Sequence, residues 1–159
     1  MEAPKLTDLI ANHLFEVHFG NNWTEVNIAD TLADVTWQEA VTQLSFTPNT
    51  IAEIVHHITY WNRAIARRGK RIAPHLNDRN GFDAPVISCE KEWKLLKDDN
   101  LHSAEELAAV IREFDEKKLP EPILPGCSSA YKNFQGQVEH AHYHLGQIVL
   151  LKKKIKAGV

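Results

Sequence analysis

The chain has 159 residues, of which 43% are hydrophobic and 25% charged, and this composition is typical of one soluble globular domain over residues 1–159. A formal net charge of −3, with no dominant basic patch, argues against nucleic acid as a partner. No apolar run approaches the ~20 residues that span a bilayer, and no signal-peptide core is present, so we expect a cytoplasmic protein with no membrane segment. Cys89 and Cys127 lie far apart and are expected to be free thiols.

Four long segments carry apolar residues at the spacing of amphipathic helices. Two of them begin at capping-box patterns, Thr50-Ile-Ala-Glu53 and Ser103-Ala-Glu-Glu106, in which the first side chain caps the helix. The long helices are predicted at residues 4–18, 50–68, 103–118 and 131–156.

The connections between these helices differ in character. Residues 28–43 are expected to form brief helical turns broken near Thr36, and residues 90–97 a short helix containing Trp93. Residues 69–85 are rich in Arg, Asn, Gly and Pro and are expected to form a loop. Because alternating strand patterns are absent, the sequence predicts an all-α four-helix bundle with extra short helices in the connections.

His140 and His144 are the most informative pair in the chain. They lie four residues apart in a predicted helix, so both imidazoles share one face and can converge on one metal ion. His142 cannot share that face. At ~100° per residue, His57 falls at the margin of the apolar stripe of its helix, whereas His56 is expected to face solvent. His57, His140 and His144 are therefore the candidate metal ligands, with an open position for a further ligand.

A di-iron carboxylate bundle is a competing interpretation. Glu53-x-x-His56 and Glu139-x-x-His142 both match the Glu-x-x-His pattern of such sites, which also need a glutamate from each remaining helix. The capping box already explains Glu53, and His56 is expected to point away from the core. The additional glutamates would be Glu16 and either Glu106 or Glu113.

Two motifs carry a family resemblance. His140-x3-His144-Leu-Gly146-Gln147 resembles the C-terminal motif, and His57-Ile-Thr-Tyr60-Trp61 the second-helix motif, of the DinB-like (damage-inducible) family, part of a wider superfamily with bacterial thiol-dependent transferases. The segments 20–23 and 32–36 resemble the first loop of that family. Residues 69–130 match only in helical character.

The resemblance implies a four-helix bundle in which His57, His140 and His144 hold one divalent metal ion. Zinc or nickel suits imidazole ligands. Members are often dimers, so a homodimer is expected. Gln147, one turn beyond His144, is a candidate to orient a ligand of the metal, and Tyr60 and Trp61 are candidates to line the pocket.

The related superfamily members suggest a metal-dependent transferase acting on a low-molecular-weight thiol, or a related hydrolase or isomerase. Two alternatives stay open. One is a non-catalytic module of a stress response that binds a metal or a small ligand. The other is a bundle whose histidines have no chemical role.

Overall fold

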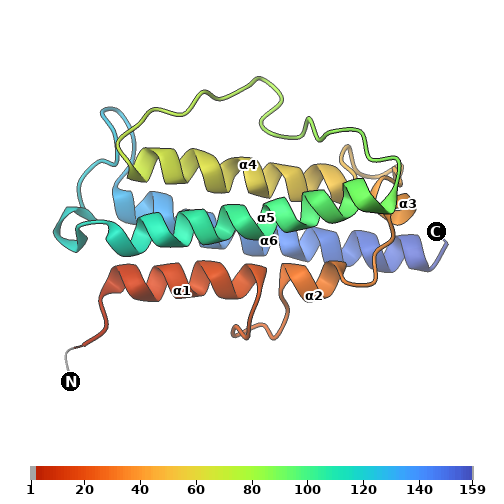
Figure 1. Ribbon diagram of the computed structural model, residues 1–159, viewed down its shortest axis with the longest axis horizontal. Coiled ribbons are helices and arrows are strands. Elements are labelled where there is room, and N and C mark those ends of the chain that lie inside the picture. The colour runs from red at the N-terminus through yellow and green to blue at the C-terminus, as the bar shows by residue number, and fades with distance from the viewer. Residues whose placement is uncertain (1–2, 159) are drawn as a thin grey trace.

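Four long helices form the predicted bundle in the computed structural model, which describes residues 3–158 (Figure 1). Within these residues there is no β-strand, so the all-α prediction is confirmed, and no helix is long and apolar enough to cross a membrane. The long helices are α1 (Leu6–His18), α4 (Ile51–Gly69), α5 (Glu90–Glu113) and α6 (Ala130–Lys156). The short ones are α2 (Ile28–Leu32), α3 (Trp37–Ala40) and the 3-10 helix η1 (Glu116–Lys118).

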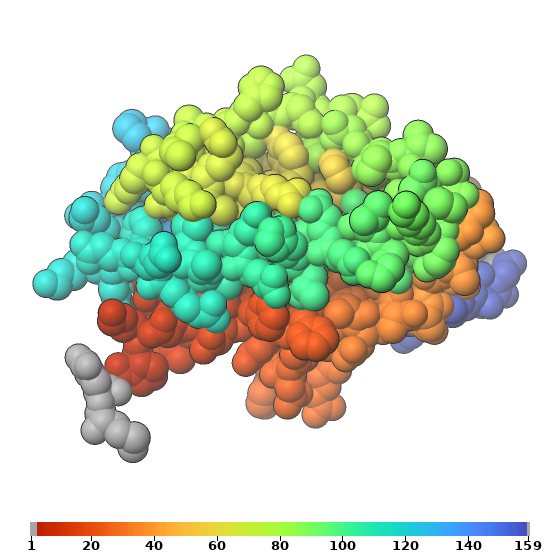
Figure 2. Space-filling model, viewed as in Figure 1, coloured from red at the N-terminus to blue at the C-terminus, as the bar shows by residue number. Residues whose placement is uncertain are grey.

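The connection between α4 and α5 runs back along the length of the bundle. α1 and α6 run in one direction and α4 and α5 in the other, so α4 and α5 are parallel neighbours (Figure 1). Parallel helices need a long crossover. Residues 70–89 supply it by passing outside α4, and they form the upper rim of the face shown in Figure 2.

Local capping fixes where the helices of the first half begin. The Thr50 hydroxyl accepts a hydrogen bond from the Glu53 amide, and the Glu53 carboxylate accepts one from the Thr50 amide at 2.8 Å, which confirms the predicted capping box of α4. Thr36 and Glu39 make the same box at the start of α3. The helical break expected near Thr36 is therefore also confirmed.

The prediction that a separate helix begins at Ser103 is wrong. Residues 90–113 form one continuous helix of 24 residues, without a glycine or proline to interrupt it. Ser103 is buried inside this helix, and its hydroxyl donates to the carbonyl of Asn100 at 2.7 Å instead of capping a new first turn. The helix ends at Glu113 rather than near residue 118. The separate 3-10 helix η1 covers Glu116–Lys118.

The interior of the bundle contains two apolar clusters and a set of buried polar side chains. One cluster includes Ile58, Trp93 and Leu145, and the other includes Leu14, Leu107 and Phe134. Four of the buried polar residues, one from each long helix, form a hydrogen-bonded group centred on Asn62. We call this set the polar layer; its members are His18, Asn62, Ser103 and Gln137.

Candidate metal centre

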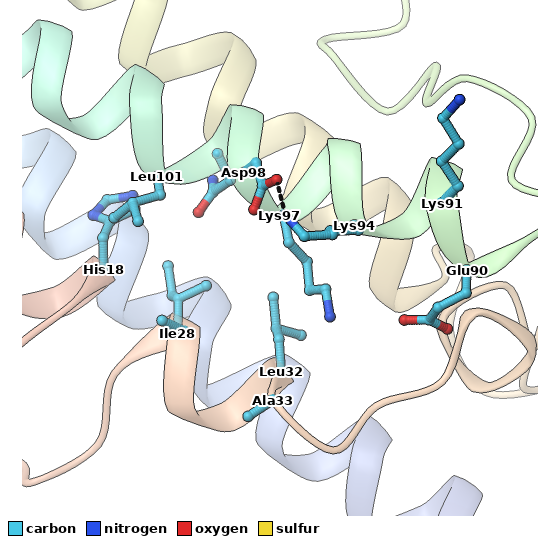
Figure 3. A pocket seen from close by; sticks show the side chains of 12 residues that line it. His18, Ile28, Leu32, Ala33, Glu90, Lys91, Lys94, Lys97, Asp98 and Leu101 are labelled. Atoms are coloured by element: carbon cyan, nitrogen blue, oxygen red, sulfur yellow. Dashed lines mark hydrogen bonds and ion pairs between the residues drawn. The ribbon is translucent and has the colours of Figure 1, made fainter.

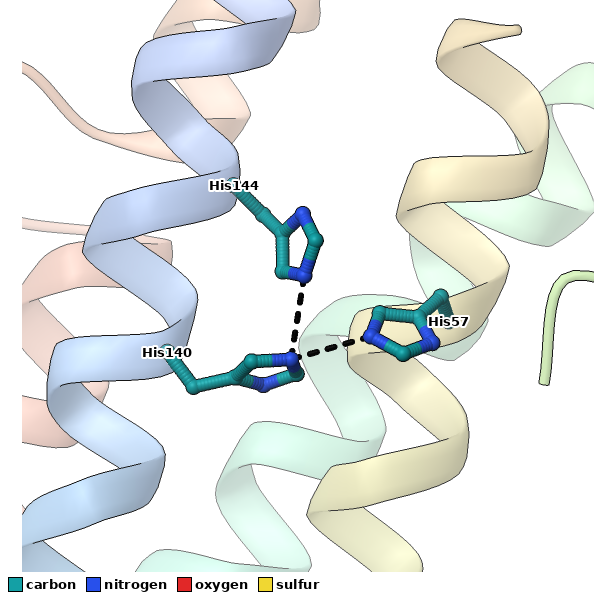
Figure 4. Close-up of side chains that lie close together, drawn as sticks. All are labelled: His57, His140 and His144. Carbon is teal, nitrogen blue, oxygen red and sulfur yellow. Dashed lines mark hydrogen bonds between the residues drawn. The ribbon is translucent and has the colours of Figure 1, made fainter. Parts of the chain in front are cut away.

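Helices α4 and α6 bring three imidazoles together. His140 and His144 lie one turn apart on α6, and His57 faces them from α4 (Figure 4). The Nε2 atom of His140 lies 2.9 Å from Nε2 of His57 and 3.0 Å from Nε2 of His144. Each residue offers one nitrogen such that all three lie within 4.8 Å of one another, and no other group of three histidine, cysteine or acidic residues in the described chain does so. We call this group the triad.

Two members of the triad direct Nδ1 at an oxygen, which is a backbone carbonyl for His57 and a side-chain amide oxygen for His144. His57 Nδ1 lies 2.6 Å from the carbonyl oxygen of Asn80, which can only accept, so Nδ1 carries the proton. His144 Nδ1 lies 2.7 Å from Gln147 Oε1, while the Gln147 amide nitrogen donates to the Tyr143 hydroxyl at 3.1 Å. The Nε2 atoms of His57 and His144 therefore both present lone pairs to the centre.

His140 cannot satisfy both of these lone pairs. Its Nε2 contacts both neighbours but carries at most one proton, and a neutral imidazole N–H points at one acceptor at a time. Its Nδ1 is buried and has no hydrogen-bond partner. The centre thus has more lone pairs than protons, and a cation among the three nitrogens removes the mismatch. Because imidazole nitrogens bind zinc at ~2.0–2.1 Å, atoms this close can share one ion.

The surroundings keep the triad neutral. Burial, together with the neighbouring imidazoles of His144 and His57, lowers the pKa of His140 to about 3. Burial lowers the pKa of His57 to about 4, although the hydrogen bond to Asn80 opposes this shift. Burial also lowers the pKa of His144. Near pH 7 the three imidazoles are therefore unprotonated, which is the form that binds a metal.

Comparison with known protein families matches residues 21–148 to the DinB superfamily. The chain belongs to the DinB superfamily. No curated protein and no solved structure matched the chain. The matched range includes all three triad residues, and membership of the DinB superfamily together with the three-histidine cluster fits a metal-binding protein.

The candidate pocket residues of this DinB superfamily member, Trp61, Gln147 and Tyr60, lie at different distances from the triad. The ring of Trp61 is 6.3 Å from that of His140 and nearly perpendicular to it. Gln147 contacts His144 directly. Tyr60 lies one layer further out, because its ring packs against Gly81 and its hydroxyl accepts a hydrogen bond from the Asn77 amide at 2.8 Å.

Sequence patterns did not indicate Asn80 and Phe82, which both contact His57. Asn80 accepts the Nδ1 proton, and the Phe82 ring stacks on the imidazole with centroids 3.9 Å apart and an interplanar angle of 7°. The Asn80-Gly81 pair is a turn signal, but it does not say which helix the turn approaches. The expectation that His56 faces solvent is wrong, because His56 is half-buried and its Nδ1 lies 2.8 Å from the Gly81 carbonyl oxygen.

The geometry does not support the di-iron interpretation. The Glu53 carboxylate is engaged at the start of α4, and Glu139 is exposed on α6. The two histidines of this pattern also have separate partners: His56 contacts the 70–89 connection, and the His142 ring lies 5.5 Å from that of His13 on α1, tilted by 56°. Among the described residues, the triad has no carboxylate within its ligand set.

A separate cavity of about 490 Å³ lies between α2 and α5 (Figure 3). Ile28, Leu32 and Leu101 supply apolar walls, and Lys97 reaches across it. The Lys97 ammonium also lies 5.3 Å from the centre of the Trp93 ring. No triad residue lines this cavity, so it gives no information on ligands of the triad.

Proposed function

We propose that this protein binds one divalent metal ion through His57, His140 and His144, with zinc or nickel as the ion. The observation that carries the proposal is the excess of lone pairs among three Nε2 atoms that lie 2.9 Å and 3.0 Å apart. Membership of the DinB superfamily supports it. Imidazole is a good ligand for both metals. The three triad imidazoles are neutral near pH 7, and their Nε2 atoms already face one another.

We propose further that the site serves a metal-dependent thiol transferase whose substrate is a low-molecular-weight thiol. Three neutral ligands leave the full charge of a bound divalent ion available to an anionic ligand such as a thiolate. The residues of the chain supply the rest: Asn80 and Gln147 accept at Nδ1 of His57 and His144, and Trp61 and Phe82 place aromatic rings beside the triad. With an epoxide as acceptor, an S–C bond forms, a C–O bond breaks, and the thiol proton ends on the released oxygen.

A non-catalytic metal-binding or small-ligand-binding module is the alternative function. The observation that favours it is the burial of two of the three ligands, since His57 is 3% exposed and His144 is 6% exposed. A buried site holds an ion well but restricts the access of a substrate. Binding and catalysis therefore need separate tests.

Metal content after reconstitution tests the binding proposal. We expect purified protein, stripped by a chelator and dialysed against zinc or nickel, to retain about one ion per chain as measured by elemental analysis. The absence of a stoichiometric ion under these conditions would refute metal binding by the triad.

Thiol consumption tests the catalytic proposal. The metal-loaded protein is incubated with low-molecular-weight thiols and an epoxide, and free thiol is followed by a colorimetric reagent. Turnover that disappears in the stripped protein and returns on reloading supports the transferase. A loaded protein that binds these thiols without consuming them supports the non-catalytic module.

A homodimer in the cytoplasm is part of the same proposal and rests on the family resemblance. Light scattering measures the molar mass of the protein as it elutes from a size-exclusion column. A mass near 18.1 kDa, that of a single chain, at micromolar concentration would contradict the dimer.

A further inference from the structure

The 70–89 connection makes its closest approach to the triad through a short turn. Asn80 and Gly81 both adopt positive φ, at 53° and 77°, so the chain reverses sharply beside α4. The Phe82 amide donates to the Arg79 carbonyl at 3.0 Å, and the Gly81 amide donates to the Asn77 side chain at 3.2 Å. We call residues 77–82 the triad loop.

Consecutive carbonyls of the triad loop point at consecutive histidines of α4. The Asn80 carbonyl oxygen lies 2.6 Å from Nδ1 of His57, and the Gly81 carbonyl oxygen lies 2.8 Å from Nδ1 of His56. His56 thus fixes the loop to the helix that carries His57. Phe82 adds a ring that covers one face of His57.

Other side chains of α4 hold the triad loop in this position. The Trp61 indole donates to the Asn80 side-chain oxygen at 3.1 Å, and the Tyr60 hydroxyl accepts from the Asn77 amide. The Tyr60 ring lies directly under Gly81, where a Cβ atom would come within 2.6 Å of it. The loop is therefore held by the helix turn on which His57 sits, and a methyl group at Gly81 displaces it.

We propose that the triad loop is a positioning element of the metal site, in which the Asn80 carbonyl fixes the His57 tautomer and His56 acts through the loop. This inference rests on the proposed metal binding. A carbonyl at Nδ1 holds the proton there and leaves Nε2 free to bind an ion, and such outer partners contribute a factor of about 10–100 to metal affinity. Neither His56 nor Asn80 contacts the ion in this arrangement.

The variant Gly81→Ala tests the proposal, because its added methyl group meets Tyr60 and moves the loop. Its matched control is Gly126→Ala: Gly126 has the same backbone strain, with φ at 78°, but nothing lies within 4 Å of an added Cβ. We expect zinc affinity, measured by competition with a chromophoric chelator, to fall about 10–100-fold in Gly81→Ala and to stay at the wild-type value in Gly126→Ala.

A second readout follows the imidazole itself without any metal. Long-range ¹⁵N–¹H spectra of the stripped protein report which ring nitrogen of His57 carries the proton. We expect Nδ1–H in the wild type and Gly126→Ala, and a population of Nε2–H in Gly81→Ala. A loop that only packs against α4 would leave this tautomer unchanged.

His56→Ala removes one anchor of the triad loop without adding bulk, so it tests the proposal even if Gly81→Ala does not fold. Its control is His102→Ala, at an exposed histidine of α5. We expect zinc affinity to fall in His56→Ala and to stay at the wild-type value in His102→Ala. Wild-type affinity and an unchanged His57 tautomer in both loop variants would overturn the proposal. Failure of the wild type and both controls to bind either zinc or nickel would instead refute the proposed function, and the His57 tautomer would still test the role of the loop.

Discussion

The polar layer and the triad are two histidine-containing clusters in one bundle, and their hydrogen bonding differs. In the polar layer, His18 donates from Nδ1 to the Leu14 carbonyl and accepts at Nε2 from the Asn62 amide. Asn62 also donates to Ser103 and accepts from Gln137 at 2.8 Å. Each of these donors meets an acceptor, so this cluster is complete without a further atom.

The triad lacks this completeness. His57 and His144 both have their Nδ1 protons engaged, so His140 faces two lone pairs with one proton at most. Buried polar groups in folded proteins are nearly always satisfied, and a mismatch of this kind points to an absent partner. Burial of a histidine therefore does not by itself indicate a ligand site. Nitrogen lone pairs that face one another without a proton between them are what indicate such a site.

Removal of a triad nitrogen is expected to have the largest effect. Each of His57→Ala, His140→Ala and His144→Ala should weaken zinc binding by about a thousandfold or more, beyond the factor that outer partners contribute. The matched control is His142→Ala, because His142 lies between two triad residues on α6 but packs against His13. Isothermal titration of the stripped proteins measures each affinity. An equal loss of zinc affinity in His142→Ala, or wild-type zinc affinity in any triad variant, would contradict the assignment of the three triad residues as the ligands.

Disruption of the polar layer should reduce stability and leave metal binding intact. Asn62→Leu leaves His18 Nε2 and the Gln137 amide without partners, at about 1–3 kcal/mol each, so the free energy of unfolding should fall by about 3 kcal/mol. Urea unfolding measures this loss. If zinc affinity at a temperature where the variant is folded fell as well, the two clusters would not be independent.

The pH dependence of stability should depend on His18. Burial lowers the pKa of His18 from 6.5 to about 4 in the folded protein, so the unfolded chain binds more protons between these values. Its contribution is present in full above pH 6.5 and is lost as the pH falls towards 4. The slope of unfolding free energy against pH in this window should be smaller by about 1.4 kcal/mol per pH unit in His18→Gln than in the wild type. Urea unfolding of metal-stripped protein gives both slopes, and identical slopes would show that His18 does not contribute to the pH dependence.

Local signals in the sequence predicted most of the bundle. The Thr50 capping box gives the start of α4, and the apolar spacing gives α1, α4 and α6 to within two residues at each end. Ser103-Ala-Glu-Glu106 was misleading because a serine hydroxyl can either cap a helix or bond to the carbonyl of the preceding turn. The choice depends on packing, since Asn62 donates to the Ser103 hydroxyl in the interior.

The candidate site was predictable only where a local spacing defines it. Four-residue spacing places His140 and His144 on one face, and helical phase favours His57 over His56 on α4. The triad loop could not be predicted, because its contacts join residues 23 and 25 positions apart and depend on how the crossover passes α4. The role of His56 was missed for the same reason: phase locates a side chain relative to its own helix, and not relative to a loop that covers it.

Imidazole ¹⁵N spectra recorded during a zinc titration of the stripped protein test the central claim most directly. We expect the Nε2 resonances of His57, His140 and His144 to shift together, with the change complete at about one equivalent of zinc. The resonances of His18 in the polar layer, and of His142, should not move. A titration in which the triad signals stay unchanged, or in which His18 shifts with them, would contradict the claim that unmatched lone pairs mark the metal site.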